Sequence, residues 1–147
     1  MADSIRQQII TALDTRLKAI KISGGYQTNA GLHVFDWLDR DLADSELDAI
    51  VYRDPSNEIA DETFNQTTNR LRLEIEARTK AAATTAAQIR KIVQDIYAAL
   101  GTDEKFGQLA YQTLQVGETI DIQQQDKIMA SATITLDVYY ITQKWSY

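Results

Sequence analysis

The sequence predicts an α+β fold, in which two helices pack on one face of a mostly antiparallel sheet. Two segments, 3–20 and 80–100, carry apolar residues at spacings of three and four, which is typical of a helix with one buried stripe. A third segment, 69–78, alternates apolar and charged residues, and this period of two indicates a strand with one buried face. Two more alternating runs close the chain. A single apolar stripe lets each helix cover one side of a sheet.

The first helix is predicted at residues 3–20. Asp3 or Ser4 can cap it, because a side-chain oxygen there accepts a hydrogen bond from the first free amides. Its apolar stripe consists of Ile5, Ile9, Leu13, Leu17 and Ile20. Three glycines then predict a loop over 23–31.

Two short strands follow, at 32–38 and 47–53, each with large side chains on both faces. The stretch that begins with Asp54 and Pro55 has turn chemistry, so residues 54–66 are predicted to leave the sheet as a loop. The next strand, 69–78, points Leu71, Leu73, Ile75 and Ala77 one way and its charged residues the other.

The second helix, 80–100, is rich in alanine, and Gly101 is predicted to end it in a left-handed conformation. The last two strands are predicted to form an antiparallel hairpin around a turn at 123–127. Apolar residues change parity before Leu114, which predicts a bulge near Thr113.

The composition limits the classes of function that the chain can have. A chain of 147 residues fits one domain over 1–147 that buries about two-thirds of its unfolded surface. There is no cysteine, which excludes disulfides and thiolate chemistry. The net charge of −6, without a cluster of Lys and Arg, argues against binding nucleic acid. No apolar run is long enough to span a membrane, and the N-terminus does not read as a secretory signal, so we expect a cytosolic protein.

No catalytic, metal or cofactor site is predicted. His33 is the only histidine, and although Asp36 is near in sequence, no nucleophile motif lies beside the pair. The segment 36–48 is acidic enough to suggest calcium, but its spacing does not match an EF-hand, so a solvated loop or an electrostatic docking patch is the better interpretation. The carboxylates of this segment are Asp36, Asp39, Asp41, Asp44, Glu46 and Asp48.

The last strand carries the one feature that indicates a function. Its polar face ends in Tyr139, Ile141 and Trp145, where the alternation predicts solvent. Either a loop of the same chain, 23–31 or 54–66, covers these side chains, or another subunit does, since exposed apolar patches are uncommon on monomers. The charged face of the strand 69–78 is a second interface candidate, or else a set of cross-strand ion pairs, through Arg70, Arg72, Glu74 and Glu76.

The chain resembles the tail-terminator, or tail-completion, proteins of long-tailed bacteriophages, including the minor tail protein U group. The resemblance lies in the opening helix "IRQQIITAL", the central helix "IRKIVQDIYAAL", the glycine-containing "GTDEKFGQLAYQTLQV" and the closing aromatic run "ITLDVYYITQKW". The segments 36–48 and 54–66 have no counterpart in that pattern.

The resemblance implies a non-enzymatic virion protein that needs no cofactor. Such proteins form a six-membered ring on the head-proximal end of the tail tube, stop its polymerisation and offer a surface to the head–tail joining protein. The implied partners are further copies of the chain, the tail tube protein and the head–tail joining protein, and the implied location is the virion tail, or the host cytoplasm during assembly. The rival hypotheses are another neck or tail structural protein and a small-ligand-binding domain or enzyme with a pocket between sheet and helices.

Overall fold

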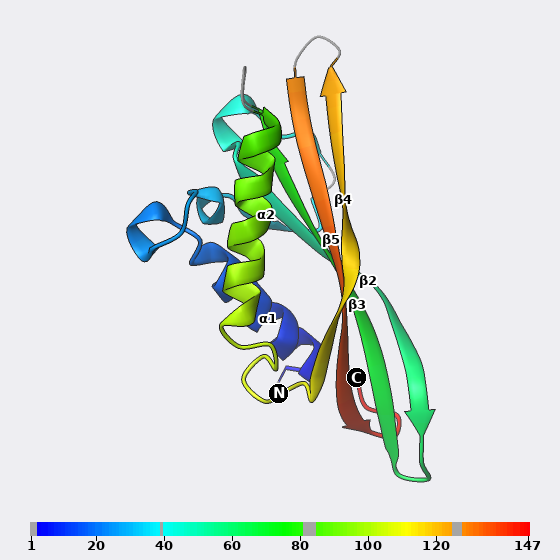
Figure 1. Cartoon of the computed structure of the whole chain (residues 1–147). Helices are drawn as coiled ribbons and strands as arrows, with labels where there is room; N and C mark the ends of the chain where they lie inside the picture. The colour runs from blue at the N-terminus through cyan, green and yellow to red at the C-terminus, as the bar shows by residue number, and fades with distance from the viewer. Residues whose placement is uncertain (1–2, 39, 81–84, 125–127) are drawn as a thin grey trace.

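The computed structural model describes residues 3–38, 40–80, 85–124 and 128–147. Two helices lie on one side of a five-stranded sheet whose order is β1-β2-β3-β5-β4 (Figure 1). The elements are α1 (Ile5–Lys18), 3₁₀ turns at Ile22–Gly24 and Ala30–Leu32, β1 (Val34–Asp36), a 3₁₀ turn at Asp44–Glu46, β2 (Ala49–Glu62), β3 (Gln66–Thr79), α2 (Thr85–Gly101), β4 (Gln112–Gln124) and β5 (Ile128–Gln143).

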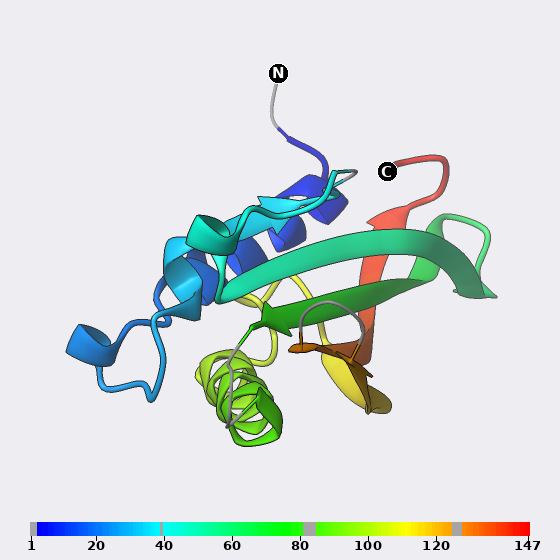
Figure 2. The same cartoon turned by 90° about the horizontal axis from the view of Figure 1, so that it is seen from above.

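The sheet is antiparallel at every junction except one. The short β1 runs parallel to β2, whereas β2–β3, β3–β5 and β4–β5 are antiparallel. α2 packs against β3 and β5, and α1 lies beside α2 and against β1. Seen from above, both helices are on the same side of the twisted sheet (Figure 2). The predicted α+β fold class is therefore confirmed.

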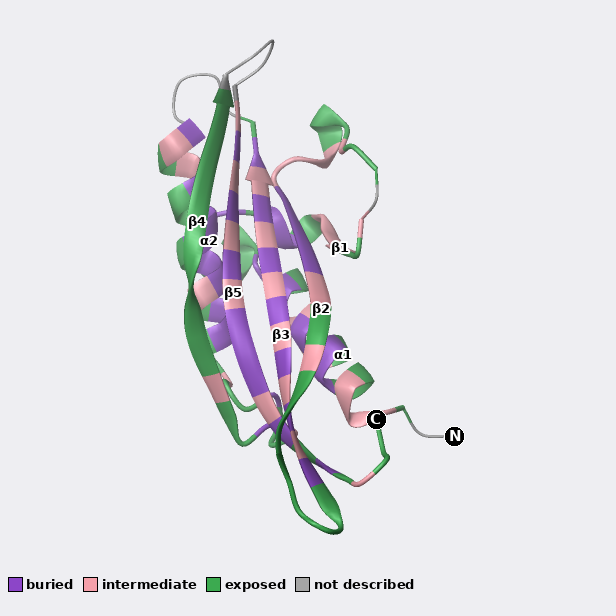
Figure 3. Ribbon diagram, turned by 90° about the vertical axis from the view of Figure 1, so that its right-hand side faces the viewer, coloured by how far each residue is buried: buried purple, intermediate pink, exposed green. Residues whose placement is uncertain are grey.

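The core lies between the helices and the face of the sheet that they cover, here called the inner face. β3 alternates between buried and partly exposed residues along its length, which gives the stripes visible in Figure 3. Its buried residues lie opposite those of β5, so that Leu73 pairs with Leu136 and Ile75 with Ile134. The predicted alternation in both strands is confirmed. It fixes the register, because a shift of one residue would move every apolar side chain from the buried face to the exposed one.

The start of α1 and the loop after it show how local sequence fixes the fold. The Ser4 hydroxyl accepts a hydrogen bond from the Gln7 amide at 3.1 Å, so Ser4 is the cap. Gly31 lies against the end of α1, where a Cβ would come within 2.6 Å of the backbone oxygens of Leu17 and Ile20. The loop can therefore approach the helix only because residue 31 is glycine.

A buried carboxylate fixes the same loop to α2. Asp95 is 3% exposed, and its carboxylate accepts the backbone N–H groups of Gln27 and Thr28 at 3.0 and 2.8 Å and the Thr28 hydroxyl at 2.7 Å. The charge is thus held by three donors that the loop supplies, which offsets its removal from water.

The predicted turn at Asp54 and the loop 54–66 are wrong. β2 continues to Glu62, and the chain reverses only between it and β3, which begins at Gln66. Pro55 lies at a register shift between Arg53 and Ser56, where the strand bulges and a missing N–H breaks no ladder bond. β1 pairs only with residues 50–52, so this part of β2 is also a free edge.

Smaller predictions need correction. Gly101 is the last residue of α2 and its φ is not left-handed; the Thr102 hydroxyl instead bonds the Ala99 carbonyl at 2.7 Å. The bulge in β4 lies between Gln115 and Gly117 rather than near Thr113. The predicted strand 32–38 shortens to Val34–Asp36. The start of the predicted second helix, at 81–84, and the predicted turn at 125–127 lie outside the described residues.

Candidate interaction surfaces

The sheet face turned away from the helices, here called the outer face, carries a ladder of ion pairs. All four predicted charges of β3 belong to it. Arg72 bonds both oxygens of Asp137 at 3.0 and 3.1 Å, and this contact raises the pKa of the guanidinium. The other pairs are Arg70 with Glu58, Glu74 with Arg53 and Glu76 with Arg78. Cross-strand ion pairs thus account for Arg70, Arg72 and Glu74, whereas Glu76 pairs along β3. A role of these charges in an interface stays a prediction.

Beside this ladder lies a group of uncovered apolar side chains, the outer patch, made of Tyr111, Leu114, Tyr139 and Ile141. Ile141 is 45% exposed, and the rings of Tyr111 and Tyr139 meet with centroids 6.1 Å apart. Leu114 lies on the same face, because its partner on β5 is Asp137. The sequence singled out Tyr139 and Ile141 but missed Tyr111, just before β4, and Leu114 of β4, whose face differs from that of Ile120 because of the bulge between them.

Trp145 is not part of the outer patch, because it lies beyond the end of β5. β5 ends at Gln143, and Trp145 takes a left-handed conformation with φ of 68° in the turn beyond it. Its side chain is 94% exposed. The expectation that a loop at 54–66 covers the late aromatic residues is thus wrong for Trp145, as that segment is part of the β2–β3 hairpin.

Trp145 belongs instead to a projection that we call the arm: residues 56–69 of the β2–β3 hairpin with the chain end, 143–147, against them. Figure 1 shows the hairpin extending past both helices. Lys144 ties the chain end to the hairpin, because its amide donates to the Asn65 carbonyl at 3.0 Å and its ammonium pairs with Glu62 at 3.1 Å. Phe64, at the hairpin turn, is 89% exposed.

A small polar network stiffens the arm where no helix covers it. Asn69 is buried, and its side-chain amide donates to the Thr142 hydroxyl at 3.0 Å and accepts from Asn57, also at 3.0 Å. The guanidinium of Arg6 lies 5.2 Å from the ring centroid of Tyr147, which links the chain end to α1. The arm therefore holds its shape with Phe64 and Trp145 almost wholly in solvent.

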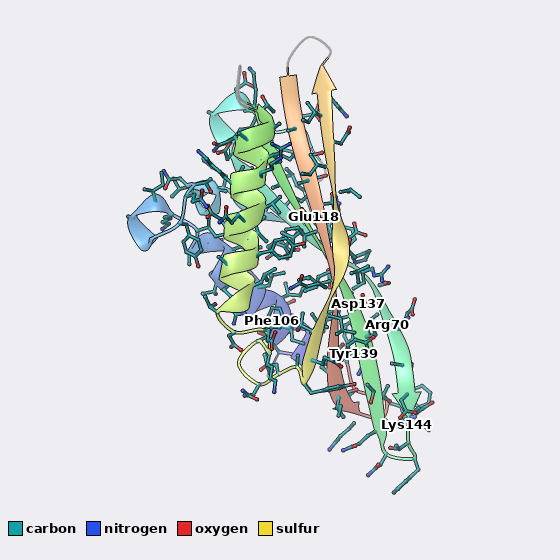
Figure 4. The ribbon with its side chains drawn as sticks, in the orientation of Figure 1. Arg70, Phe106, Glu118, Asp137, Tyr139 and Lys144 are labelled. Carbon is teal, nitrogen blue, oxygen red and sulfur yellow. The ribbon has the colours of Figure 1, made fainter. Side chains whose placement is uncertain are left out.

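The second uncovered surface is a groove between α2 and β4. α2 packs against β3 and β5, and β4, beyond them at the edge of the sheet, is exposed from Leu114 to Gln123 (Figure 3). Ile120, opposite Ala132, is 45% exposed, and Ile122 is exposed beside it. The groove has a volume of about 380 Å³ and is lined by Arg90, Val93, Gln94, Tyr97, Glu118 and Ile120. The side-chain view labels Glu118 by β4 next to α2 (Figure 4).

The groove continues toward the end of α2 as a smaller cavity of about 100 Å³, bordered by Tyr97, Leu100 and Phe106. Tyr97 lines both spaces, and partial burial, with the nearby Glu118, raises the pKa of its hydroxyl. Apolar side chains with charged and amide groups beside them are a lining that a protein partner can cover. The sequence missed this groove, because alternation in β4 does not tell which strands the helices leave open.

Three carboxylates of the acidic segment 36–48 have partners within the chain: Asp44 pairs with Lys80, Asp48 accepts from Thr79 and Gln88, and Glu46 pairs with Arg40. Arg40 bonds Glu46 through two contacts of 2.8 Å, which lowers the Glu46 pKa to about 2, with help from the Ala43 amide. Near β1, burial raises the pKa of Asp36, reinforced by the charges of Asp54 and Asp14. Among the described residues, no group of three or more His, Cys, Asp or Glu could hold a metal ion.

His33 lies between a 3₁₀ turn and β1. Its carbonyl accepts the Ile50 amide at 2.9 Å, so its backbone has a structural role at the start of the sheet. Within the described part of the chain, no helix has the length and apolar character that crossing a membrane requires.

The chain is similar in structure to chains of known structure. The chain is similar to a chain in the virion of a native gene transfer agent (GTA) particle, with a TM-score of 0.44, 14% identical residues, and an alignment over 95% of this chain and 92% of that one. No protein-family model matches the sequence. No curated protein matches it either.

Proposed function

We propose that the chain is a structural protein of a phage or prophage tail, built as one tail-terminator-like domain over 1–147. Copies of it form a ring, with six members, on the end of the tail tube, where the ring ends tube growth and presents a surface to the head–tail joining protein. It performs no reaction in this role. It acts in the virion tail and, before that, in the cytoplasm of the host.

The observation that carries the proposal is the pair of uncovered apolar surfaces at different places on one sheet: the arm, with Phe64 and Trp145, and the α2–β4 groove, with Ile120. A chain that meets its neighbours through two different patches makes heterologous contacts, and these close into rings when the rotation allows. The order of helix, strands, helix and hairpin is also the one on which the resemblance to tail terminators rests.

The rival hypothesis, a ligand-binding domain or enzyme, predicts a polar cleft between sheet and helices. That space is filled by core side chains, such as Ile92 and Ile96 of α2 against Leu73 and Leu136 of the sheet. The two cavities at the edge of this space lie between α2 and β4, and the larger one combines Val93, Tyr97 and Ile120 with Arg90, Gln94 and Glu118. A partner surface can cover such a lining.

Electron microscopy of tail tubes tests the proposal. Tubes purified from the virus or prophage that encodes the chain are mixed with gold-labelled protein. We expect one label at one end of each tube and arrest of further tube growth. Label along the tube walls would indicate a tube component instead, and absence of label would overturn the role at the tail.

Two variants test whether the late aromatic residues serve this assembly. Tyr139→Ala and Trp145→Ala should keep the fold nearly intact but weaken binding to the tube end, since neither side chain lies in the core. Ile22→Ala is the matched control, because Ile22 is also apolar and exposed but lies in the 3₁₀ turn Ile22–Gly24 that follows α1. Equal binding by all three variants would remove these residues from the interface.

A further inference from the structure

We propose that the arm of one copy of the chain docks in the α2–β4 groove of the next copy. This inference rests on the proposed function and identifies the contact that joins neighbours in the ring. The occupant of the groove is thus a second copy of this chain, and the inserted side chains are Phe64 and Trp145.

The arm offers enough apolar area to anchor such a contact. Phe64 and Trp145 are 89% and 94% exposed, so nearly their whole surface is available for burial. Two aromatic side chains bury about 300 to 500 Å² together. A stable interface needs about 800 Å² from each partner, with a few aromatic anchors at its centre, so these two residues would supply about half of it.

The groove offers a complementary surface. Its floor is apolar, formed by Val93 of α2, Ile120 of β4 and the ring of Tyr97, and its volume of about 380 Å³ accepts an aromatic side chain. Gln94 and Arg90 lie at the α2 rim, where they can bond the polar atoms of an inserted hairpin. Aromatic anchors in an apolar slot with a polar rim are the usual anatomy of a protein interface.

Charge also favours the arm on the α2 side of the groove. The arm carries three carboxylates, of which Glu58 is paired with Arg70 and Glu62 with Lys144. The third, Asp61, forms no ion pair with the residues that the structure describes. On α2, Arg90 and Lys91 are exposed and form no ion pair with any residue that the structure describes. Opposite charges at the rim speed association and fix orientation.

The same charges argue against a different contact, in which the free edge of the arm extends the sheet at β4. That pairing would bring Glu118 and Asp121 of β4 beside the carboxylates of the arm. Like charges directly opposite each other on paired strands are destabilising. Docking in the groove still brings the arm near Glu118, but it also places the arm beside Arg90 of α2.

A copy cannot fill its own groove. Ile120 pairs with Ala132 of β5, whereas the tip of the arm lies at the other end of that strand, where Gln66 pairs with Gln143. Eleven residues of strand separate the two places by about 35 Å. The contact is therefore between copies, and because arm and groove are different surfaces, it can link a series of subunits.

Disulfide trapping tests the inference, and the chain suits it because it contains no cysteine. Phe64→Cys and Ile120→Cys are made as separate variants, mixed in equal amounts on tube ends and mildly oxidised. We expect the mixed disulfide to form several-fold more than either homodimer, and a Phe64→Cys, Ile22→Cys mixture, as control, to form it only at the background level. Homodimers in excess, or no excess over the control, would overturn the contact.

A charge exchange provides a second readout. Arg90→Glu with Lys91→Glu should lower the yield of mixed disulfide several-fold, and Asp61→Lys in the partner should restore it. Lack of rescue would contradict the orientation. If trapping fails while the wild-type protein still caps tube ends, the ring uses another contact and the proposed function stands; if capping itself fails, the function is wrong.

Discussion

The Asp95 clamp predicts a large loss of stability from one small change, Asp95→Asn. The carboxylate is 3% exposed and accepts three hydrogen bonds from Gln27 and Thr28, at 2.7 to 3.0 Å. An asparagine keeps one of the two carboxylate oxygens. Its NH₂ group takes the place of the other oxygen and there faces an N–H or O–H donor of the loop. At least one charge-assisted bond is lost, and one buried N–H is left without an acceptor.

The magnitude follows from these contacts. A hydrogen bond to a charged group contributes about 1.5 to 3 kcal/mol, and an unpaired buried amide costs about 1 to 3 kcal/mol. Removing the buried charge recovers part of this loss. We therefore expect the free energy of unfolding to fall by about 2 to 3 kcal/mol, which corresponds to a drop in Tm of about 5 to 10 °C for a chain of this size.

Urea denaturation, followed by circular dichroism, measures this change. Asp121→Asn is the matched control, because Asp121 lies exposed on β4, and we expect it to alter stability by less than about 0.5 kcal/mol. A loss below about 1 kcal/mol in Asp95→Asn would refute the reasoning that the loop 23–31 is held to α2 by this carboxylate.

Two further predictions concern backbone space and charge. Gly31→Ala should destabilise the fold by about 2 to 3 kcal/mol, since its Cβ would lie 2.6 Å from two backbone oxygens. Gly101→Ala, with open space around its Cβ, should instead stabilise α2 by about 0.5 kcal/mol. Equal urea denaturation midpoints for the two variants would contradict this. The Glu46 carboxyl, whose pKa is about 2, should hold its contact with Arg40 above about pH 4.5 and lose it as the pH falls toward 2. NMR titration should show this midpoint, and Arg40→Gln should raise it; an unchanged midpoint would exclude the Arg40 contact as the main cause.

Much of the fold could be predicted from the sequence because single-faced elements leave a clear pattern. The strict alternation of β3 and the apolar stripe of α2 follow directly from one dry face, which fixes register and orientation. The length of β2 could not be predicted, because Asp54 and Pro55 are turn formers. The strand continues past them only because it bulges there and has a free edge beside the bulge.

The interaction surfaces were predicted only in part. Tyr139 and Ile141 stood out because they break an alternation, and the structure leaves Ile141 exposed and Tyr139 partly so. The groove depends on how far α2 reaches across the sheet, which no local pattern contains. Asp95 did carry a signal, since an aspartate within the apolar stripe of α2 requires partners from elsewhere in the chain.

Cryo-electron microscopy of capped tail-tube ends tests the central claim most directly. We predict a closed ring of six copies in which each arm, residues 56–69 with the chain end, lies across α2 of its neighbour and places Phe64 and Trp145 near Ile120. Tube ends without this chain, or copies that meet through β4 edge to edge with their arms in solvent, would contradict the account.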